Sequence, residues 1–210
     1  MTSAKPPVRR GRPPKISRDH AETREMLLRC GMQILTEQGF AATGIDTVLK
    51  RIQVPKGSFY HYFESKEAFG QAVLHRYADY FARKLDRWFL AQELPPLQRL
   101  TGFVEDAKAG MTRYAFRRGC LVGNLGQEVL VLPESFRQQL EAVLQDWENR
   151  LVGCLNAAVE AGEISSDQDC QALAAYFWIG WEGAVLRARL VQDPRPLDTF
   201  FKGFLAGITR

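Results

Sequence analysis

Residues 43–63 contain two short helical patterns separated by a break of two residues, and this spacing constrains the fold more than any other feature. In the first pattern, apolar residues recur at intervals of three and four, which predicts a short amphipathic helix that Thr43 would cap. In the second, Pro55 suits the first position of a helix that we expect to reach about Phe63. The apolar positions of the first pattern are Ile45, Val48, Leu49 and Ile52.

Longer helices are predicted on both sides of this pair. One extends from about Arg18 to Gln38, where Gly39 closes it. The other begins near Lys66, after the capping residue Ser65, and continues to about Phe89. The helix that ends at Gln38 and the two short helices after it make three helices, and a tight turn joins the two short ones. This arrangement is a helix-turn-helix, which is a DNA-binding unit.

The remainder of the sequence is also helical in pattern, and no segment alternates apolar and polar residues as a strand does. The sequence therefore predicts an all-α fold. We expect a disordered basic arm over residues 1–17, a DNA-binding unit over 18–66 and a larger body over 67–210. Further helices are expected over 96–118, within 120–130, over 133–161 before Gly162, from the cap Asp167 to Val191, and over 197–207.

The positive charge is concentrated at one end of the chain. Residues 1–66 carry twelve Lys and Arg against six Asp and Glu, whereas the rest is slightly acidic. This asymmetry favours a polyanionic partner for that end alone. We find neither a membrane-spanning run nor a signal peptide, and the four scattered cysteines form no disulfide or metal pattern, so we expect a protein of the reducing cytoplasm without a metal or cofactor.

The basic arm contains the run Arg9-Arg10-Gly11-Arg12-Pro13. It resembles the Arg-Gly-Arg-Pro core of AT-hook peptides, in which an extended backbone places arginines in a narrow A·T-rich minor groove. On that interpretation Arg9, Arg10 and Arg12 contact DNA. An ordinary solvated basic tail is the alternative.

Three motifs together carry a resemblance to a known family. Gly39-Phe40 closes the first helix, Val-Pro-Lys-Gly-Ser-Phe-Tyr-His-Tyr-Phe occupies residues 54–63, and Ser-Lys-Glu follows at 65–67. This combination resembles the TetR family of transcriptional repressors, tightly over about residues 18–75 and elsewhere by helix count. The resemblance implies a homodimer that binds double-stranded operator DNA, with an effector pocket in the body.

Within this motif, residue chemistry suggests which side chains contact DNA. Thr43 and Lys56 stand at helix N-termini, where backbone N–H groups favour phosphates, and Gly57 permits close approach to bases. Phe59, Phe63 and much of Tyr62 are expected to pack inward. The remaining DNA-binding candidates are Ser58 for a base edge or phosphate, Tyr60, His61 and Tyr62 for the sugar-phosphate backbone, and Lys66 for one further phosphate.

The helix before Val191 contains small residues among large ones, a pattern that suits close packing against a second copy. The monomer's own core is the alternative for this stripe. Its residues are Leu173, Phe177, Gly180, Trp181, Ala184, Val185 and Ala188.

Residues 114–128 and 177–183 resemble a TetR subgroup that responds to acrylate and reactive electrophiles. The resemblance implies an effector that is acrylate or a related small unsaturated acid. Arg117 and Arg118 beside Cys120 could favour its thiolate, although a small buried hydrophobe is the alternative for this cysteine. The effector-binding candidates are Tyr114, Arg118, Cys120, Asn124, Trp178, Trp181 and Glu182.

Other functions remain open at this stage. The effector could instead be a drug or an acyl-CoA, or the protein could sense redox state through Cys120. A non-specific architectural DNA binder would leave the neutral body unexplained. An enzyme is not expected, because His20, His61 and His75 form no nucleophile–base set with Cys120 or Ser58.

Overall fold

The computed structural model describes residues 20–209, and within this range the chain forms nine helices and no strand. The predicted all-helical fold is confirmed. The basic arm with Arg9, Arg10 and Arg12 lies outside the described residues, as does the expected helix start near Arg18. The helices are α1 (His20–Gln38), α2 (Ile45–Ile52), α3 (Lys56–Phe59), α4 (Lys66–Phe89), α5 (Pro96–Arg113), α6 (Leu121–Gln127), α7 (Glu134–Glu160), α8 (Cys170–Val191) and α9 (Arg195–Ile208).

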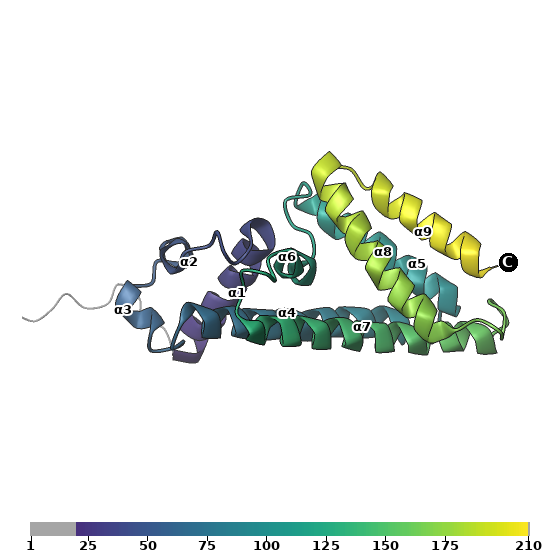
Figure 1. Cartoon of the computed structure of the whole chain (residues 1–210), viewed down its shortest axis with the longest axis horizontal. Coiled ribbons are helices and arrows are strands. Elements are labelled where there is room, and N and C mark those ends of the chain that lie inside the picture. Colours follow the sequence, from purple (N-terminus) through teal and green to yellow (C-terminus); the bar gives the residue numbers. More distant parts are fainter. Residues whose placement is uncertain (1–19, 210) are drawn as a thin grey trace, which may run out of the picture.

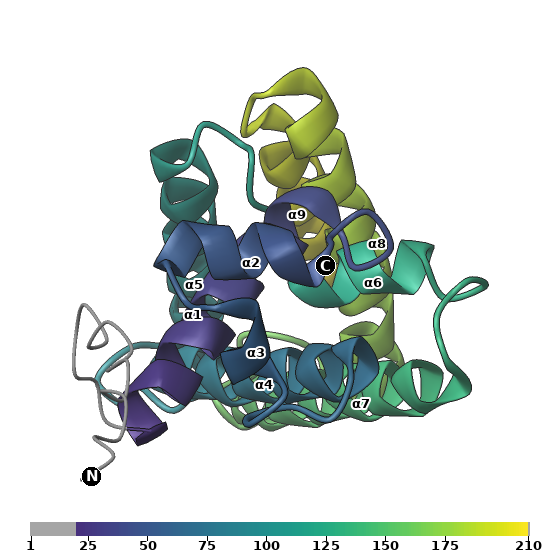
Figure 2. The ribbon, with the colours of Figure 1, turned by 90° about the vertical axis from the view of Figure 1, so that its left-hand side faces the viewer.

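The molecule is elongated, with α1–α3 at one end and α8 and α9 toward the other (Figure 1). We call α1–α3 the headpiece and α4–α9 the body. The long helices α4 and α7 pack against each other along the body. The view from the headpiece end shows α3 in front of α4, with α2 above it (Figure 2). Because α1 packs on both α4 and α6, the headpiece is joined to the body by those two helices.

The turn between α2 and α3 is as tight as the sequence predicts, but α3 is shorter. Gln53 takes a left-handed conformation (φ 56°), and Val54 N–H donates to the Leu49 carbonyl at 3.1 Å. After Phe59 the N–H groups of His61 and Tyr62 bond to carbonyls three residues back, so the chain tightens into successive turns. The expected helix to Phe63 therefore ends one turn early, although Phe59 and Phe63 are both buried as predicted.

Two of the three predicted side-chain caps are wrong. Ser65 does cap α4, since its hydroxyl accepts from Ala68 N–H at 3.0 Å. Thr43 does not cap α2: it is buried, and its hydroxyl donates to the Gly39 carbonyl at 2.6 Å. At α8 the cap is Asp169 rather than Asp167, because Asp169 Oδ1 accepts from the N–H groups of residues 171 and 172.

The stripe of small and large residues predicted on α8 lies mainly in the monomer core. Phe177 and Trp181 are buried and stack with ring centroids 5.7 Å apart. This confirms the alternative of core packing for most of the stripe, because Ala184, Val185 and Ala188 are buried as well. A different face of α8 is exposed. This outer stripe consists of Ala172, Tyr176, Ile179, Gly183, Leu186 and Leu190.

Among residues 20–209, none of the helices has the length and apolar character that crossing a bilayer requires.

Candidate DNA interface and effector cavity

The α3 segment presents one apolar face inward and a polar face outward. Phe59 and Phe63 pack against Phe69 of α4, with ring centroids 5.0–5.5 Å apart. Lys56 and His61 are exposed, and 56% of Tyr60 remains accessible. The local sequence explains this division, because aromatic residues four apart bury one side of a short helix and leave its N-terminal residues outside.

Gly57 and Lys56 stand together at the outward N-terminus of α3. A Cβ added at Gly57 would meet nothing within 4 Å, so the protein's own packing does not require glycine there. Lys56 Nζ lies 3.1 Å from Asp46 of α2, but both side chains are mostly exposed, and such pairs stabilise a fold weakly. Ser58 lies half-buried beside them.

Three other predicted DNA contacts already bind the protein's own groups. Thr43 is buried, and its backbone N–H donates to the Phe40 carbonyl, so the group expected to meet a phosphate is occupied. Tyr62 is half-buried against the ring of His20, with centroids 4.3 Å apart. Lys66 places its ammonium 4.4 Å from the centroid of the Phe40 ring.

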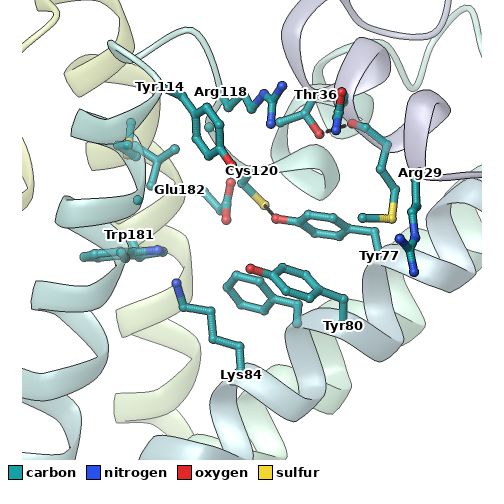
Figure 3. Close-up of a pocket in the computed structure, with 18 residues that line it drawn as sticks. Arg29, Thr36, Tyr77, Tyr80, Lys84, Tyr114, Arg118, Cys120, Trp181 and Glu182 are labelled. Atoms are coloured by element: carbon teal, nitrogen blue, oxygen red, sulfur yellow. Dashed lines mark hydrogen bonds between the residues drawn. The ribbon is translucent and has the colours of Figure 1, made fainter. Parts of the chain in front are cut away.

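A cavity of about 340 Å³ lies where the headpiece meets the body (Figure 3). Its wall combines residues of α1, α4, α5 and α8 with the connection between α5 and α6. Five of the seven predicted effector-binding residues line it together: Tyr114, Arg118, Cys120, Trp181 and Glu182.

The other two predicted residues lie elsewhere. Trp178 is buried in the aromatic core behind the cavity, with its ring centroid 5.0 Å from that of Trp147. Asn124 joins three helices instead: its amide donates to the Thr36 carbonyl of α1 at 2.5 Å and accepts from Arg189 of α8 at 2.5 Å. Its hydrogen-bonding capacity is thus directed away from the cavity.

Tyr114 and Arg118 form the part of the wall that touches the headpiece. The predicted helix to Arg118 ends at Arg113, because Ala115 and Phe116 take positive φ angles. The turn that follows brings the Arg118 guanidinium 4.0 Å from the Tyr114 ring centroid. Arg118 also forms an ion pair of 2.8 Å with Glu37 in the last turn of α1.

Cys120 is buried, and its thiol is not activated in the way the neighbouring arginines suggested. Burial and the nearby Glu182 carboxyl raise the pKa of the Cys120 thiol well above its usual range. Arg118 and Arg117 direct their charge to Glu37 instead. The expectation that nearby positive charge favours the thiolate is therefore wrong. The sulfur accepts from Gly123 N–H at 3.4 Å and from the Tyr77 hydroxyl at 3.8 Å.

Glu182 places a carboxyl in the same wall. Burial raises its pKa to about 7, and the facing Cys120 thiol offsets part of that rise. One carboxyl oxygen, Oε1, is buried and has no hydrogen-bond partner in the part of the chain that the structure describes. The other occupies the space beside Gly123, where an added Cβ would come within 2.0 Å of it. Glycine at that position of α6 therefore allows the carboxyl to fit.

Sequence reasoning missed the cation on the opposite wall. Lys84 of α4 lines the cavity with only 13% of its side chain exposed, and burial lowers its pKa. Asp106 of α5 holds it at 3.2 Å. A signal was available, since Lys84 follows Tyr77 and Phe81 at intervals of four and three residues and so continues their apolar helix face. Over the described residues, no cluster of His, Cys, Asp and Glu is arranged to hold a metal ion.

Comparisons with known families match both parts of the chain. Residues 27–73 match the family described as bacterial regulatory proteins, tetR family. Residues 96–204 match the family described as tetracyclin repressor-like, C-terminal domain. The second match alone covers about half of the chain, and together they span the helix-turn-helix and the cavity-bearing body.

Individual proteins resemble the chain over most of its length. The transcriptional regulator AcuR of Cereibacter sphaeroides is 50% identical over 196 residues, which cover 93% of this chain and 89% of that protein. A crystal structure of regulatory protein TetR from Rhodobacter sphaeroides superposes with a TM-score of 0.86 at 50% identity, covering 88% of this chain and 97% of that one. The reduced form of Escherichia coli NemR gives a TM-score of 0.80 at 29% identity, covering 90% and 97%.

Proposed function

The chain belongs to the TetR family of bacterial transcriptional regulators, and from this premise we propose that it is a dimeric repressor released from a palindromic operator by a small unsaturated carboxylic acid such as acrylate. In this proposal residues 18–66 bind the DNA, and residues 67–210 dimerise and bind the effector. No catalytic step is involved.

The outward face of α3 supports the assignment of the DNA-reading surface. Lys56 is positioned to neutralise a phosphate, while Tyr60 and His61 extend from the same exposed face. Gly57 is the sharpest indication, because its lack of a side chain serves no contact with any of residues 20–209. A glycine at an outward helix N-terminus allows the backbone to approach the edges of the bases closely.

The outer stripe of α8 supports dimerisation. Its six residues recur at intervals of three and four, and they include Ile179 with 75% and Leu190 with 70% of the side chain exposed. An apolar stripe of this length on a soluble protein indicates a partner surface. A second copy of α8 and α9 packed against it would form a four-helix interface and place two α3 helices about 34–36 Å apart, the spacing of successive major grooves.

The cavity carries the effector proposal, because it sets cationic side chains against aromatic walls. Lys84 and Arg118 can attract a carboxylate, and Tyr77, Phe81 and Trp181 can pack on a short hydrocarbon chain. A volume of about 340 Å³ suits a small acid better than an acyl-CoA. The raised pKa of Cys120 also favours reversible binding over attack by its thiol.

Release follows from the composition of the wall. Residues of α1 line the cavity beside residues of the body, and Arg118 links the two through Glu37. An effector carboxylate competes with Glu37 for Arg118. Binding therefore favours an arrangement in which the headpiece is less firmly held, and the two α3 helices lose the spacing that the operator requires.

The test is a DNA-binding titration with an operator selected from random double-stranded DNA by the protein itself. We expect a palindromic site and release of the protein by acrylate. Lys84→Met keeps the length of the side chain without its charge, so this variant should bind the operator normally and need a much higher acrylate concentration for release. Selection of a non-palindromic sequence, or release by drugs and acyl-CoA but by no small acid, would contradict the proposal.

A further inference from the structure

The carboxyl of Glu182 has a buried oxygen aimed into the effector cavity with nothing to bind it. Oε1 is excluded from solvent and has no hydrogen-bond partner among the described residues. The close-up of the cavity shows the side chain projecting from α8 toward Cys120 and Tyr77 (Figure 3). Leaving a buried acceptor unsatisfied is unfavourable, so a ligand that satisfies it gains affinity there.

The charged and titratable groups around this carboxyl leave it without a counter-ion. Lys84 pairs with Asp106, Arg118 with Glu37, and Arg29 of α1 with Glu25. The lining residues contributed by α5 are Ala107, Gly110 and Met111, which carry no charge. The other titratable groups of the cavity wall are weak acids: Cys120 beside α6, Tyr77 and Tyr80 of α4, and Tyr114 of the connection.

An ionised Glu182 would oppose the ligand that Lys84 and Arg118 attract. Two carboxylates in one poorly solvated cavity repel each other, and a shared proton converts that repulsion into a hydrogen bond. We propose that Glu182 takes up a proton when the effector binds and donates its carboxyl hydrogen bond to the effector carboxylate, which makes Glu182 the residue that selects for an acid. This inference rests on the proposed function and adds a proton to its binding step.

The proton balance is simple. The effector enters the cavity as a carboxylate, and the ionised Glu182 takes one proton from the solvent. Glu182 and the bound effector then carry one negative charge between them, which Lys84 and Arg118 neutralise. Burial already holds the pKa of Glu182 at about 7, and the arriving carboxylate raises it further. Below that pH, Glu182 is already protonated before the effector binds, so the affinity for the effector does not change with pH. Above it, the dissociation constant rises about tenfold for each pH unit.

The experiment measures acrylate and propionate binding to the full chain without DNA, by titration calorimetry from about pH 6 to about pH 9 in two buffers of different ionisation enthalpy. Propionate lacks the double bond, so its binding excludes a covalent step. We expect uptake of nearly one proton at the alkaline end and none at the acidic end. A change in the intrinsic tryptophan fluorescence gives an independent measure of occupancy, since the ring of Trp181 lines the cavity.

Glu182→Gln is the matched variant, because an amide of the same shape donates a hydrogen bond at every pH. It should bind within a few fold of the unmodified chain at about pH 6 and lose the proton uptake. Any pH dependence of the acid's affinity that persists in Glu182→Gln is assigned to Lys84, whose pKa is also shifted. A Lys84→Met variant should remove that remaining dependence. A slope unchanged by Glu182→Gln overturns the inference.

Further outcomes separate this inference from the proposed function. Binding of acrylate without a pH dependence leaves the effector proposal intact and overturns the role of Glu182. Affinity for either acid that instead rises with pH, by an amount that depends on Glu182, would mean that the ionised carboxylate favours binding, which also overturns the inference. If neither acid binds at any pH, both the proposed effector and this inference fail.

Discussion

Arg118 and Glu37 form a 2.8 Å ion pair that joins the wall of the effector cavity to the last turn of α1. Only 11% of the Glu37 side chain and 21% of the Arg118 side chain are exposed, so solvent screens this pair less than a surface pair. A second bond lies nearby, where Glu128 after α6 accepts from the N–H groups of Phe40 and Ala41 at 3.1 and 2.8 Å. The body thus holds the last turn of α1 through Arg118 of the cavity wall, and the residues just after α1 through Glu128.

We expect Glu37→Gln to imitate the effector in part. If Arg118 holds the headpiece in its DNA-binding arrangement, removing its partner's charge should lower operator affinity about fivefold or more without effector. The ratio of affinities with and without acrylate should shrink as well. Binding of acrylate itself should stay the same or tighten, because Arg118 then has no competing carboxylate. Unchanged operator affinity in a fluorescence anisotropy titration would exclude the pair as the link.

Gly57→Ala separates a DNA contact from stability. Because a Cβ there meets nothing, the variant should unfold at the same temperature or slightly above, with a gain of about 0.5 kcal/mol from helix propensity. Operator affinity should nevertheless fall about tenfold, since the methyl group would occupy the space closest to the bases. Gly153→Ala on α7 is the control, because that exposed glycine also has open space around it and lies in the body.

Lys56→Ala tests the phosphate contact through salt. The slope of log affinity against log salt concentration should decrease by about one, and affinity should fall for all sequences rather than for the operator alone. Arg137→Ala removes an exposed, ion-paired cation from α7 and should leave the slope unchanged. An equal effect of the two variants would mean that only net charge matters.

The sequence predicted the headpiece better than the cavity, for a physical reason. The burial of Phe59 and Phe63 and the cap at Ser65 depend on neighbours a few residues away, so local spacing encodes them. The cavity combines segments from five parts of the chain, and Lys84 and Arg118 come to line the same cavity only after folding. Thr43 shows the same limit, because a turn that closes back on Gly39 removed the capping hydroxyl.

On α8 the difficulty lies in composition rather than distance. The helix is apolar on nearly every side, so periodicity could not separate the face that packs inside from the face that remains outside. Trp178, expected in the cavity, therefore lies in the core, whereas its neighbour Ile179 is exposed. Asn124 was among the expected effector-binding residues, yet the partners of its amide come from α1 and α8.

Ile179→Glu tests the dimer. A carboxylate in the outer stripe of α8 should give a folded monomer, because the side chain is already exposed in a single subunit and only a second copy would bury it. Light scattering after size-exclusion chromatography should show half the mass, with an unchanged circular dichroism spectrum. Operator affinity should fall about 100-fold or more, since one headpiece then binds one half-site.

Leu130→Glu is the control for this experiment, because Leu130 is 96% exposed and lies between α6 and α7, away from α8. It should remain dimeric and bind the operator. A dimer that persists in Ile179→Glu would place the interface on another surface.

The raised pKa of Glu182 also makes the stability of the protein depend on pH. Its value in the fold is about 7, against an ordinary 4.5, so ionisation is easier in the unfolded chain. The stabilisation is complete below about pH 4.5 and is lost as the pH rises through about 7. Glu182→Gln should therefore match the unmodified chain near pH 4.5 and exceed it by up to about 3 kcal/mol at pH 8 in urea unfolding. Glu141→Gln changes an exposed glutamate of α7 and should show no such gain. If the difference in unfolding free energy between Glu182→Gln and the unmodified chain stays constant with pH, ionisation of Glu182 does not destabilise the fold.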